Sequence, residues 1–291
     1  MHRKVISLAK STNVVTLPNR WCEENSIGKG DQVSVAENGD SVVISPVALK
    51  KTIVLDISGV LPMIRRILGA AYKSGYDVMK ISYSTKEELS TAEEVIDQEF
   101  VGFEISEIDR DAKVIKAMSI SEPSPDDFET MLRRLILMVC DMAEEIRISA
   151  DDSTKLAKAA EKDKEVNKIA DYCRRVINRN SLLKLSERYV RNPPLYFIVE
   201  QIEKVGDGFR DVALSDGIDE DMFKDAEDFF RMFYDLFYNF NFILLSRFAE
   251  RRKELKETLE KKAKDGKSTS QYRDIIEKTF DMNGALIALN I

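Results

Sequence analysis

The fold predicted for most of the chain rests on one helical stretch, VEQIEKVGDGFRDVA at residues 199–213. Within it, Glu203 and Asp207 are four residues apart, so on a helix both carboxylates point from one face, one turn apart. The pattern returns as IEKTFDMNGAL, which gives Glu277 and Asp281 the same spacing. Two like charges at this spacing destabilise a helix by roughly 0.2–0.5 kcal/mol. Each pair is therefore expected to face a metal ion, a basic side chain or water.

Length and charge place limits on the class of protein. A chain of 291 residues is too long for one ordinary core, so two or three domains are expected. Hydrophobic residues make up 44% and charged residues 33%, which is typical of a soluble, helix-rich protein. The net charge of −7 argues against a protein that coats nucleic acid over its whole surface, but it is compatible with one small basic module.

Cysteine and histidine usage favours a reducing, cytoplasmic location. Cys22, Cys140 and Cys173 are odd in number and scattered, and His2 is the only histidine. Neither a disulfide framework nor a zinc site is therefore expected. The first residues lack the apolar segment of a signal peptide. The most apolar late run, residues 229–248, contains charged residues, so we predict a buried helix and no membrane insertion.

Residues 1–50 are predicted to form a small all-β domain. A short helix is expected after Pro18, and Asn38-Gly39 is a strong hairpin signal. Four short strands around one helical turn bury too little surface alone, so we expect an intertwined dimer. The strands are expected at residues 5–8, 13–17, 32–36 and 41–45.

This domain resembles the SpoVT/AbrB (MazE-like) swapped-hairpin family. Leu17-Pro18, Gly28-Lys29-Gly30-Asp31 and the last strand, Val42-Val43-Ile44, occur in the family's order. The resemblance implies a homodimer that exchanges strands, with a basic surface that often contacts double-stranded DNA. Seven basic and five acidic side chains leave an excess of only two charges in residues 1–51, so pure dimerisation remains the alternative. The predicted phosphate contacts are Arg3, Lys4, Lys10 and Arg20.

Residues 51–121 are predicted to form a small α+β domain with the order β-α-β-α-β-β. Neither a glycine-rich phosphate loop nor a nucleophile elbow is recognisable in its sequence. We interpret it as a connector that couples the two ends of the chain, and a small ligand at its helix N-termini is the alternative.

Residues 122–291 are predicted to be all-α, with six helices in two tandem three-helix bundles at about 125–217 and 219–291. The second predicted helix is a continuous segment from Ser153 to about Arg179. A proline pair at 193–194 starts the third helix, which carries the opening motif. The remaining helices are expected at about 128–149, 221–240, 241–264 and 269–288.

This second predicted helix, followed by Ile202-Glu203-Lys204-Val205-Gly206-Asp207, resembles a PhoU domain, whose third helix typically reads IERIGD. The resemblance spans about residues 125–291, and PhoU proteins hold two such bundles. In the second bundle Thr279-Phe280 replaces the usual Ile-Gly. The family binds metal clusters through acidic side chains on the second and third helices of each bundle. The ligands implied here are Glu203, Asp207, Glu277, Asp281 and Asp163.

The metal that such sites imply is a hard or borderline cation such as iron, manganese or magnesium, because all ligands are oxygens. Two features weaken the pattern. On the second predicted helix, Asp163 is followed four residues later by Asn167, a weaker ligand. On the fifth, Glu250 and Glu254 could serve as ligands, but basic residues at 251–253 crowd them. Lysines at 162, 164, 168 and 204 offer alternative partners, so ion-paired carboxylates are the competing interpretation.

Together the two resemblances imply a regulator of phosphate uptake or phosphate-responsive transcription, not an enzyme. Its dimeric AbrB-like head would bind DNA and its PhoU-like body would sense a transporter, a partner or a metal state. The alternative is an adaptor that docks on a phosphate transporter ATPase and never touches DNA. Di-metal enzymatic chemistry has little support, because the only histidine lies at the terminus and no nucleophile–base pair is evident.

Overall fold

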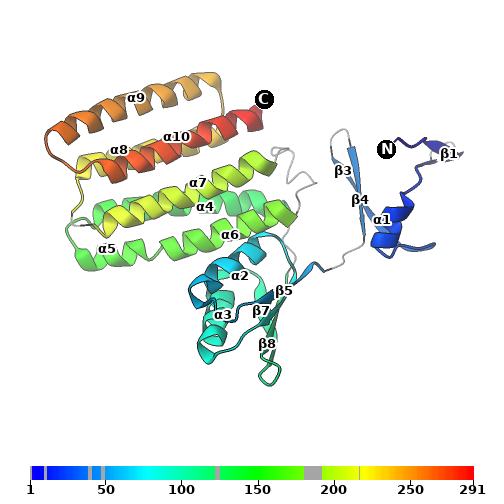
Figure 1. The fold of residues 1–291 in the computed structure, drawn as a ribbon. Coiled ribbons are helices and arrows are strands. Elements are labelled where there is room, and N and C mark those ends of the chain that lie inside the picture. Colours follow the sequence, from blue (N-terminus) through cyan, green and yellow to red (C-terminus); the bar gives the residue numbers. More distant parts are fainter. Residues whose placement is uncertain are drawn as a thin grey trace. The chain divides into compact units, whose positions relative to one another are not determined.

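The computed structural model describes residues 2–9, 12–38, 41–46, 50–121, 125–179, 192–215 and 217–291. The chain divides into two compact units, residues 1–50 and residues 51–291 (Figure 1). The first unit contains two small antiparallel sheets, and the second contains a four-stranded sheet and a large group of helices. The chain is therefore mixed, with small sheets near its N-terminus and a helical C-terminal region. No helix in the described ranges has the length and apolarity needed to cross a bilayer.

The first unit is built from two hairpins and one short helix. Strand β1 (Ile6–Ala9) pairs antiparallel with β2 (Thr12–Val14), and β3 (Val33–Asn38) pairs antiparallel with β4 (Ser41–Pro46). Helix α1 (Asn19–Glu24) begins directly after Pro18, as the sequence predicts. Strands are present near all four predicted positions, but the second ends at Val14 and does not extend to Leu17 as predicted. Gly39, in the predicted hairpin turn, lies outside the described residues.

The first unit has no buried side chain among its described residues. Six large apolar side chains are instead 46–71% exposed: Val5, Ile6, Leu8, Val15, Val35 and Val42. Burial of apolar surface is the main force that holds a fold together, and this unit leaves its apolar strand residues in water. One copy of the unit therefore lacks a core of its own.

The second unit begins with the predicted β-α-β-α-β-β segment, which is confirmed. Its sheet has the order β5-β6-β8-β7, with β5 parallel to β6 and the other neighbours antiparallel. Helices α2 and α3 contribute buried residues to one core with the sheet, where Tyr72 stacks on Phe100 at 4.4 Å between ring centroids. The elements are β5 (Thr52–Asp56), the 3-10 turn η1 (Leu61–Met63), α2 (Ile64–Lys73), β6 (Val78–Ser82), α3 (Lys86–Glu99), β7 (Phe103–Asp109) and β8 (Val114–Ser119).

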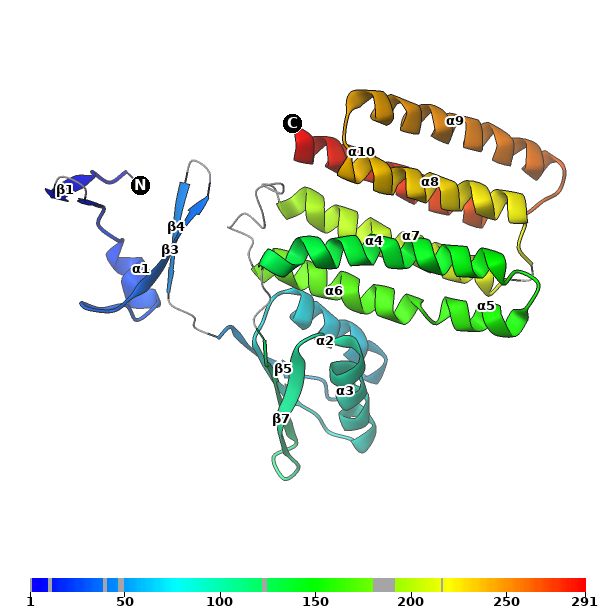
Figure 2. The same ribbon diagram turned by 180° about the vertical axis from the view of Figure 1, so that it is seen from behind.

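The helical part follows as seven helices in the described residues. Figures 1 and 2 show α9 on the outside, then α8 and α10, then α4 and α7, and finally α5 and α6, with α2 beside α6. The helices are α4 (Pro125–Ile148), α5 (Ser153–Ala160), α6 (Asp163–Arg179), α7 (Asn192–Ala213), α8 (Glu220–Tyr238), α9 (Phe242–Lys264) and α10 (Ser270–Asn290).

One predicted helix is wrong in its continuity. The segment 153–179 consists of two helices, α5 and α6, which separate at residues 161–162. At this break the backbone N–H groups of Lys162 and Lys164 bond to carbonyls three residues back, as in a tight 3-10 turn. A hydrophobic pattern does not reveal such a local tightening, because the apolar period continues through it. The break makes Asp163 the first residue of α6.

The two helix sets share a single hydrophobic core. Phe209 of α7 contacts Phe223 and Phe230 of α8, with ring centroids 5.4 and 6.4 Å apart. Both glycines of the α7 motif lie at close helix contacts. A Cβ at Gly206 would meet Val166 Cγ1 of α6 at 3.3 Å, and a Cβ at Gly208 would meet Ile275 Cγ1 of α10 at 2.6 Å. The motif glycines thus let α7 approach both of its neighbours.

The α+β segment is joined to α6 by one buried arginine. Arg175 is 1% exposed, and its Nη1 donates to the carbonyl oxygens of Tyr76 (2.6 Å) and Tyr72 (3.0 Å). Its guanidinium also lies 5.0 Å from the Phe103 ring centroid and 3.4 Å from Asp77 Oδ1. A buried cation with this many partners holds the two layers in one geometry.

Candidate functional site

The predicted acidic residues of the first helix set come together between α6 and α7. Asp163 opens α6 and is 4% exposed, while Asp207 lies on α7 beside the close contact at Gly206. A single nitrogen, Nη1 of Arg210, donates to Asp163 Oδ2 at 2.6 Å and to Asp207 Oδ1 at 2.5 Å. The other nitrogens of the Arg210 fork, Nη2 and Nε, donate to Asp211 at 2.8 and 3.1 Å. The cation between the two predicted ligands is thus a guanidinium group.

Glu203 has an arginine of its own. Arg174 on α6 is 5% exposed and donates from Nη2 to Glu203 Oε2 at 2.6 Å. Its Nη1 donates to Asp171 Oδ1 at 2.8 Å, and Asp171 in turn lies 3.4 Å from the ammonium of Lys73 on α2. A chain of four alternating charges therefore runs from the α7 motif to the α+β segment.

Two opposing effects set the pKa values in this cluster: burial disfavours the charged form of each group, and pairing with an opposite charge favours it. Burial raises the pKa of Asp163, although the Arg210 bond and charge oppose it, and burial likewise raises the pKa of Asp207. Burial works against the charged form of Arg210, but its bonds to Asp211 and Asp163 outweigh it and raise its pKa. Arg210 therefore stays charged, and Asp163 and Asp207 share its Nη1 group.

Two buried oxygens of the cluster have no hydrogen-bond donor within the described structure, namely Asp163 Oδ1 and Asn167 Oδ1. The Asn167 amide donates to the other oxygen of Asp163 at 3.0 Å. A pair of neighbouring acceptors suits one water molecule, which has two hydrogens to donate. One oxygen each of Asp163, Asp207 and Glu203 already accepts from an arginine nitrogen. A divalent cation bound to these oxygens would have to displace a guanidinium group, so the carboxylates as placed fit arginine partners and not a metal ion.

The second predicted pair lies in a different environment. Glu277 on α10 accepts from Arg252 of α9, by a bond of 3.0 Å from Nε and a shorter one from Nη2, and Lys256 lies 3.5 Å away. The guanidinium of Arg252 also lies 4.4 Å from the ring centroid of Phe280. Asp281 is exposed and has no hydrogen bond or ion pair with any described residue. The structure thus separates Asp281 from the groups that hold Glu277.

The partners of the acidic motifs are arginines, one of the alternatives expected from the sequence, although neither Arg210 nor Arg174 was named in advance. Lys204 pairs instead with Glu200 at 2.7 Å, one turn away on its own helix, and Lys162 pairs with Glu145 of α4. Arg210 was recognisable in principle, because it follows Asp207 by three residues on the same helical face. Arg174 was not, since its contact with Glu203 crosses two helices. Across the described ranges no group of three or more acidic, cysteine or histidine side chains is placed to hold a metal ion.

The predicted DNA contacts lie on the first unit. Arg3 and Lys4 are exposed just before β1, and Arg20 is exposed on α1. Arg20 donates to Glu24 at 2.7 Å, a pairing one turn apart that reduces its free charge. Lys10 lies outside the described residues. The described basic side chains are therefore accessible, and one of the three is ion-paired.

The helix N-termini of the α+β segment hold an internal anion. The carboxylate of Glu88 is 3% exposed and accepts from three backbone N–H groups: Gly59 at 2.6 Å, Ser84 at 2.7 Å and Thr85 at 2.9 Å. These bonds, that from Ser84 first, lower the pKa of Glu88 to about 2. The donors that a small anionic ligand would use are thus occupied by the protein itself.

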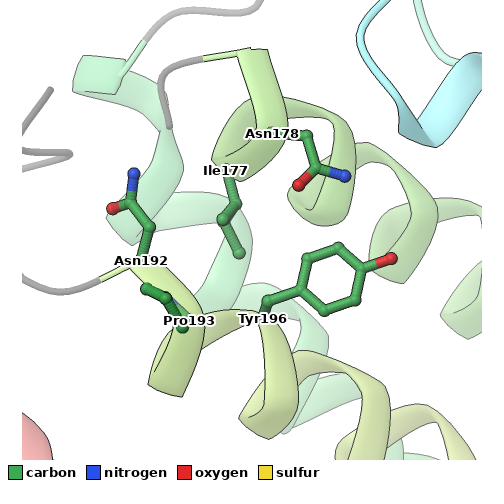
Figure 3. Close-up of a pocket in the computed structure, with 5 residues that line it drawn as sticks. All are labelled: Ile177, Asn178, Asn192, Pro193 and Tyr196. Carbon is green, nitrogen blue, oxygen red and sulfur yellow. The ribbon is translucent and has the colours of Figure 1, made fainter. Parts of the chain in front are cut away.

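A pocket of about 460 Å³ lies between the end of α6 and the start of α7 (Figure 3). The Asn178 amide donates to the carbonyl of Lys73 at 2.8 Å, so it is already engaged. The pocket is lined by Ile177, Asn178, Asn192, Pro193 and Tyr196, none of which is charged at neutral pH.

Comparison of the chain with family models, with curated proteins and with solved structures found no match.

Proposed function

We propose that this protein is a regulator of phosphate uptake or phosphate-responsive transcription that binds DNA through a dimeric AbrB-like head and senses its signal through a PhoU-like body. The dimeric head is proposed because none of the described side chains of the first unit is buried. Six of its large apolar side chains are 46–71% exposed. A second copy that exchanges strands would supply the missing core.

The phosphate part of the proposal rests on the motif at residues 202–207 and its resemblance to the PhoU family. The two motif glycines support it physically, because they allow α7 to lie close to α6 and α10, as a third helix of a tight bundle must. The signal would reach the head through the α+β segment, which Arg175 fastens to α6.

A protein-interaction adaptor is the second candidate, and the ion pair between Arg20 and Glu24 favours it. With this pair formed, the first unit has one fewer free cationic side chain, and affinity for DNA depends strongly on such side chains. In that case the dimeric head would be a clamp, and the body would dock on a phosphate transporter ATPase.

DNA binding at stepped salt concentrations separates the two candidates. The full-length protein should bind genomic DNA fragments with an affinity that falls as salt rises, and Arg3→Glu with Arg20→Glu should abolish binding. Lys224→Glu with Lys253→Glu is the matched control, because both lysines are exposed on the helical part and the charge change is the same. Absence of binding at low salt by a dimer of normal stability would leave only the adaptor.

A further inference from the structure

Four of the five predicted acidic ligands accept hydrogen bonds from arginines. Arg210 stands between Asp163 and Asp207, Arg174 bonds Glu203, and Arg252 bonds Glu277. A guanidinium group offers five donors in a fixed fork and stays charged at any working pH, so it serves as a permanent counter-ion for carboxylates.

Arg210 occupies the place where a shared cation would sit. Its Nη1 donates to one carboxylate oxygen of α6 and one of α7 by short, charge-assisted hydrogen bonds. A divalent ion bound to the same two oxygens would meet the guanidinium charge at close range. Binding the ion would therefore require Arg210 to leave and to abandon Asp211 as well.

The second helix set provides an internal comparison. When the two motifs are aligned on Glu203 and Glu277, Asp281 corresponds to Asp207 and Gly284 corresponds to Arg210. Asp281 is exposed, and no described residue pairs with it. The arginine is thus present where the aspartate is half-buried against a second carboxylate, and it is absent where the aspartate is solvated by water.

We infer that Arg210 and Arg174 are built-in counter-cations for Asp163, Asp207 and Glu203. The resemblance of the motif implies a metal cluster at these carboxylates, and here guanidinium groups of the chain take its place. The inference does not rest on DNA binding, because every residue in it belongs to the helical part, on α6, α7, α9 or α10. It predicts a protein whose stability is independent of divalent cations.

The first test is on the wild-type full-length protein, purified without chelators. Elemental analysis should find no stoichiometric iron, manganese, magnesium or zinc, and neither EDTA nor Mn²⁺ should move the thermal midpoint, Tm. A wild-type protein that carries one or more metal ions per chain, or whose Tm falls with EDTA, would overturn the inference.

The second test removes the counter-cation. Arg210→Gln should lower Tm by roughly 2–6 °C, because two partly buried carboxylates then face each other. Added Mn²⁺ should raise the Tm of this variant but not that of Arg210→Lys, which keeps a positive charge at the position. Arg252→Gln is the matched control in the second set, where Glu277 lacks a second acidic partner and Mn²⁺ should have no effect. A Tm of Arg210→Gln that equals the wild-type value, or that Mn²⁺ does not raise, would contradict the role assigned to Arg210.

Discussion

The motif Glu-Lys-x-x-Asp occurs in α7 and again in α10, but the two copies have different surroundings. In α7 it lies between α6 and α10, its two glycines are at helix contacts, and two charged residues of α6, Asp163 and Arg174, lie beside it. In α10 Phe280 replaces Gly206, Arg252 lies over that ring, and Asp281 points to water. The comparison teaches that the local pattern determines which helix face carries the carboxylates, whereas the surrounding side chains determine the partner of each carboxylate.

The first helix set also carries the α+β segment, and the second set does not. Arg175 of α6 makes this connection from a position that is 1% exposed. Four substitutions test the contrast between the sets, beginning with this residue.

Arg175→Ala should give the largest loss of stability. It removes a buried cation and leaves Asp77, which is 4% exposed, and two backbone carbonyls with fewer partners. Asp77 keeps its ion pair with Arg179 at 2.7 Å, so the cost comes mainly from the two carbonyls, at roughly 1.5–3 kcal/mol for each hydrogen bond to a charged group. Urea unfolding followed by circular dichroism would detect this loss. Arg251→Ala in α9 is the control, because its pairs with Asp225 and Glu254 are partly exposed and worth at most about 1 kcal/mol. Equal losses in the two variants would mean that the α+β segment is not fastened through Arg175.

Gly208→Ala should be the next most damaging change. The added methyl group would lie 2.6 Å from Cγ1 of the buried Ile275 on α10, and overpacking of this kind costs about 1–3 kcal/mol. A double-mutant cycle with Ile275→Ala is the decisive measurement. The cost of Gly208→Ala should disappear in that background, and a cost that persists would place the strain elsewhere.

Gly284→Ala should act in the opposite direction. No atom lies within 4 Å of the added methyl group, and glycine inside a helix is about 0.5–1 kcal/mol less favourable than alanine. We expect a higher urea midpoint with an unchanged slope. A loss of stability would show that the exposed face of α10 is packed against something in solution.

Asp281→Asn should have the smallest effect, within about 0.5 kcal/mol, because the side chain is exposed and solvated. Asp207→Asn is the matched substitution in α7 and should destabilise more, since Arg210 then loses one of the carboxylates that hold it. The measurement is the Tm of the two variants, determined by thermal unfolding under the same conditions. Equal decreases in Tm would show that the two aspartates do not differ in their contribution to stability.

Much of the fold was predictable because it depends on the spacing of apolar residues and on the prolines and glycines that begin or end helices and strands. The hairpin at 33–46, the α+β order and the positions of the helices follow from alternation, helical spacing, Pro18 and the proline pair at 193–194. The exception is the break at residues 161–162, where the apolar period continues while the hydrogen bonds tighten.

The candidate site was predictable only in part. The sequence pointed to Asp163, Glu203 and Asp207, and the structure brings these three into one cluster. Their counter-charges were expected to be a metal ion, an arginine or lysine of a neighbouring helix, or water, and they are Arg174 of the neighbouring helix and Arg210 of α7 itself. Lysines close in sequence attach to carboxylates one turn away or on another helix, so proximity along the chain does not settle a pairing.

The amino-acid sequence alone determined which residues are helical, which are extended and which face of α7 carries the acids, since these depend on local conformation and on spacing along the backbone. It also determined that residues 1–50 have too few apolar side chains to enclose a core. Only the tertiary structure decided which cation neutralises each carboxylate and how the α+β segment attaches to α6. Both depend on side chains that are distant in sequence and meet within a few ångströms, as Arg174 does with Glu203 and Arg175 with Tyr76.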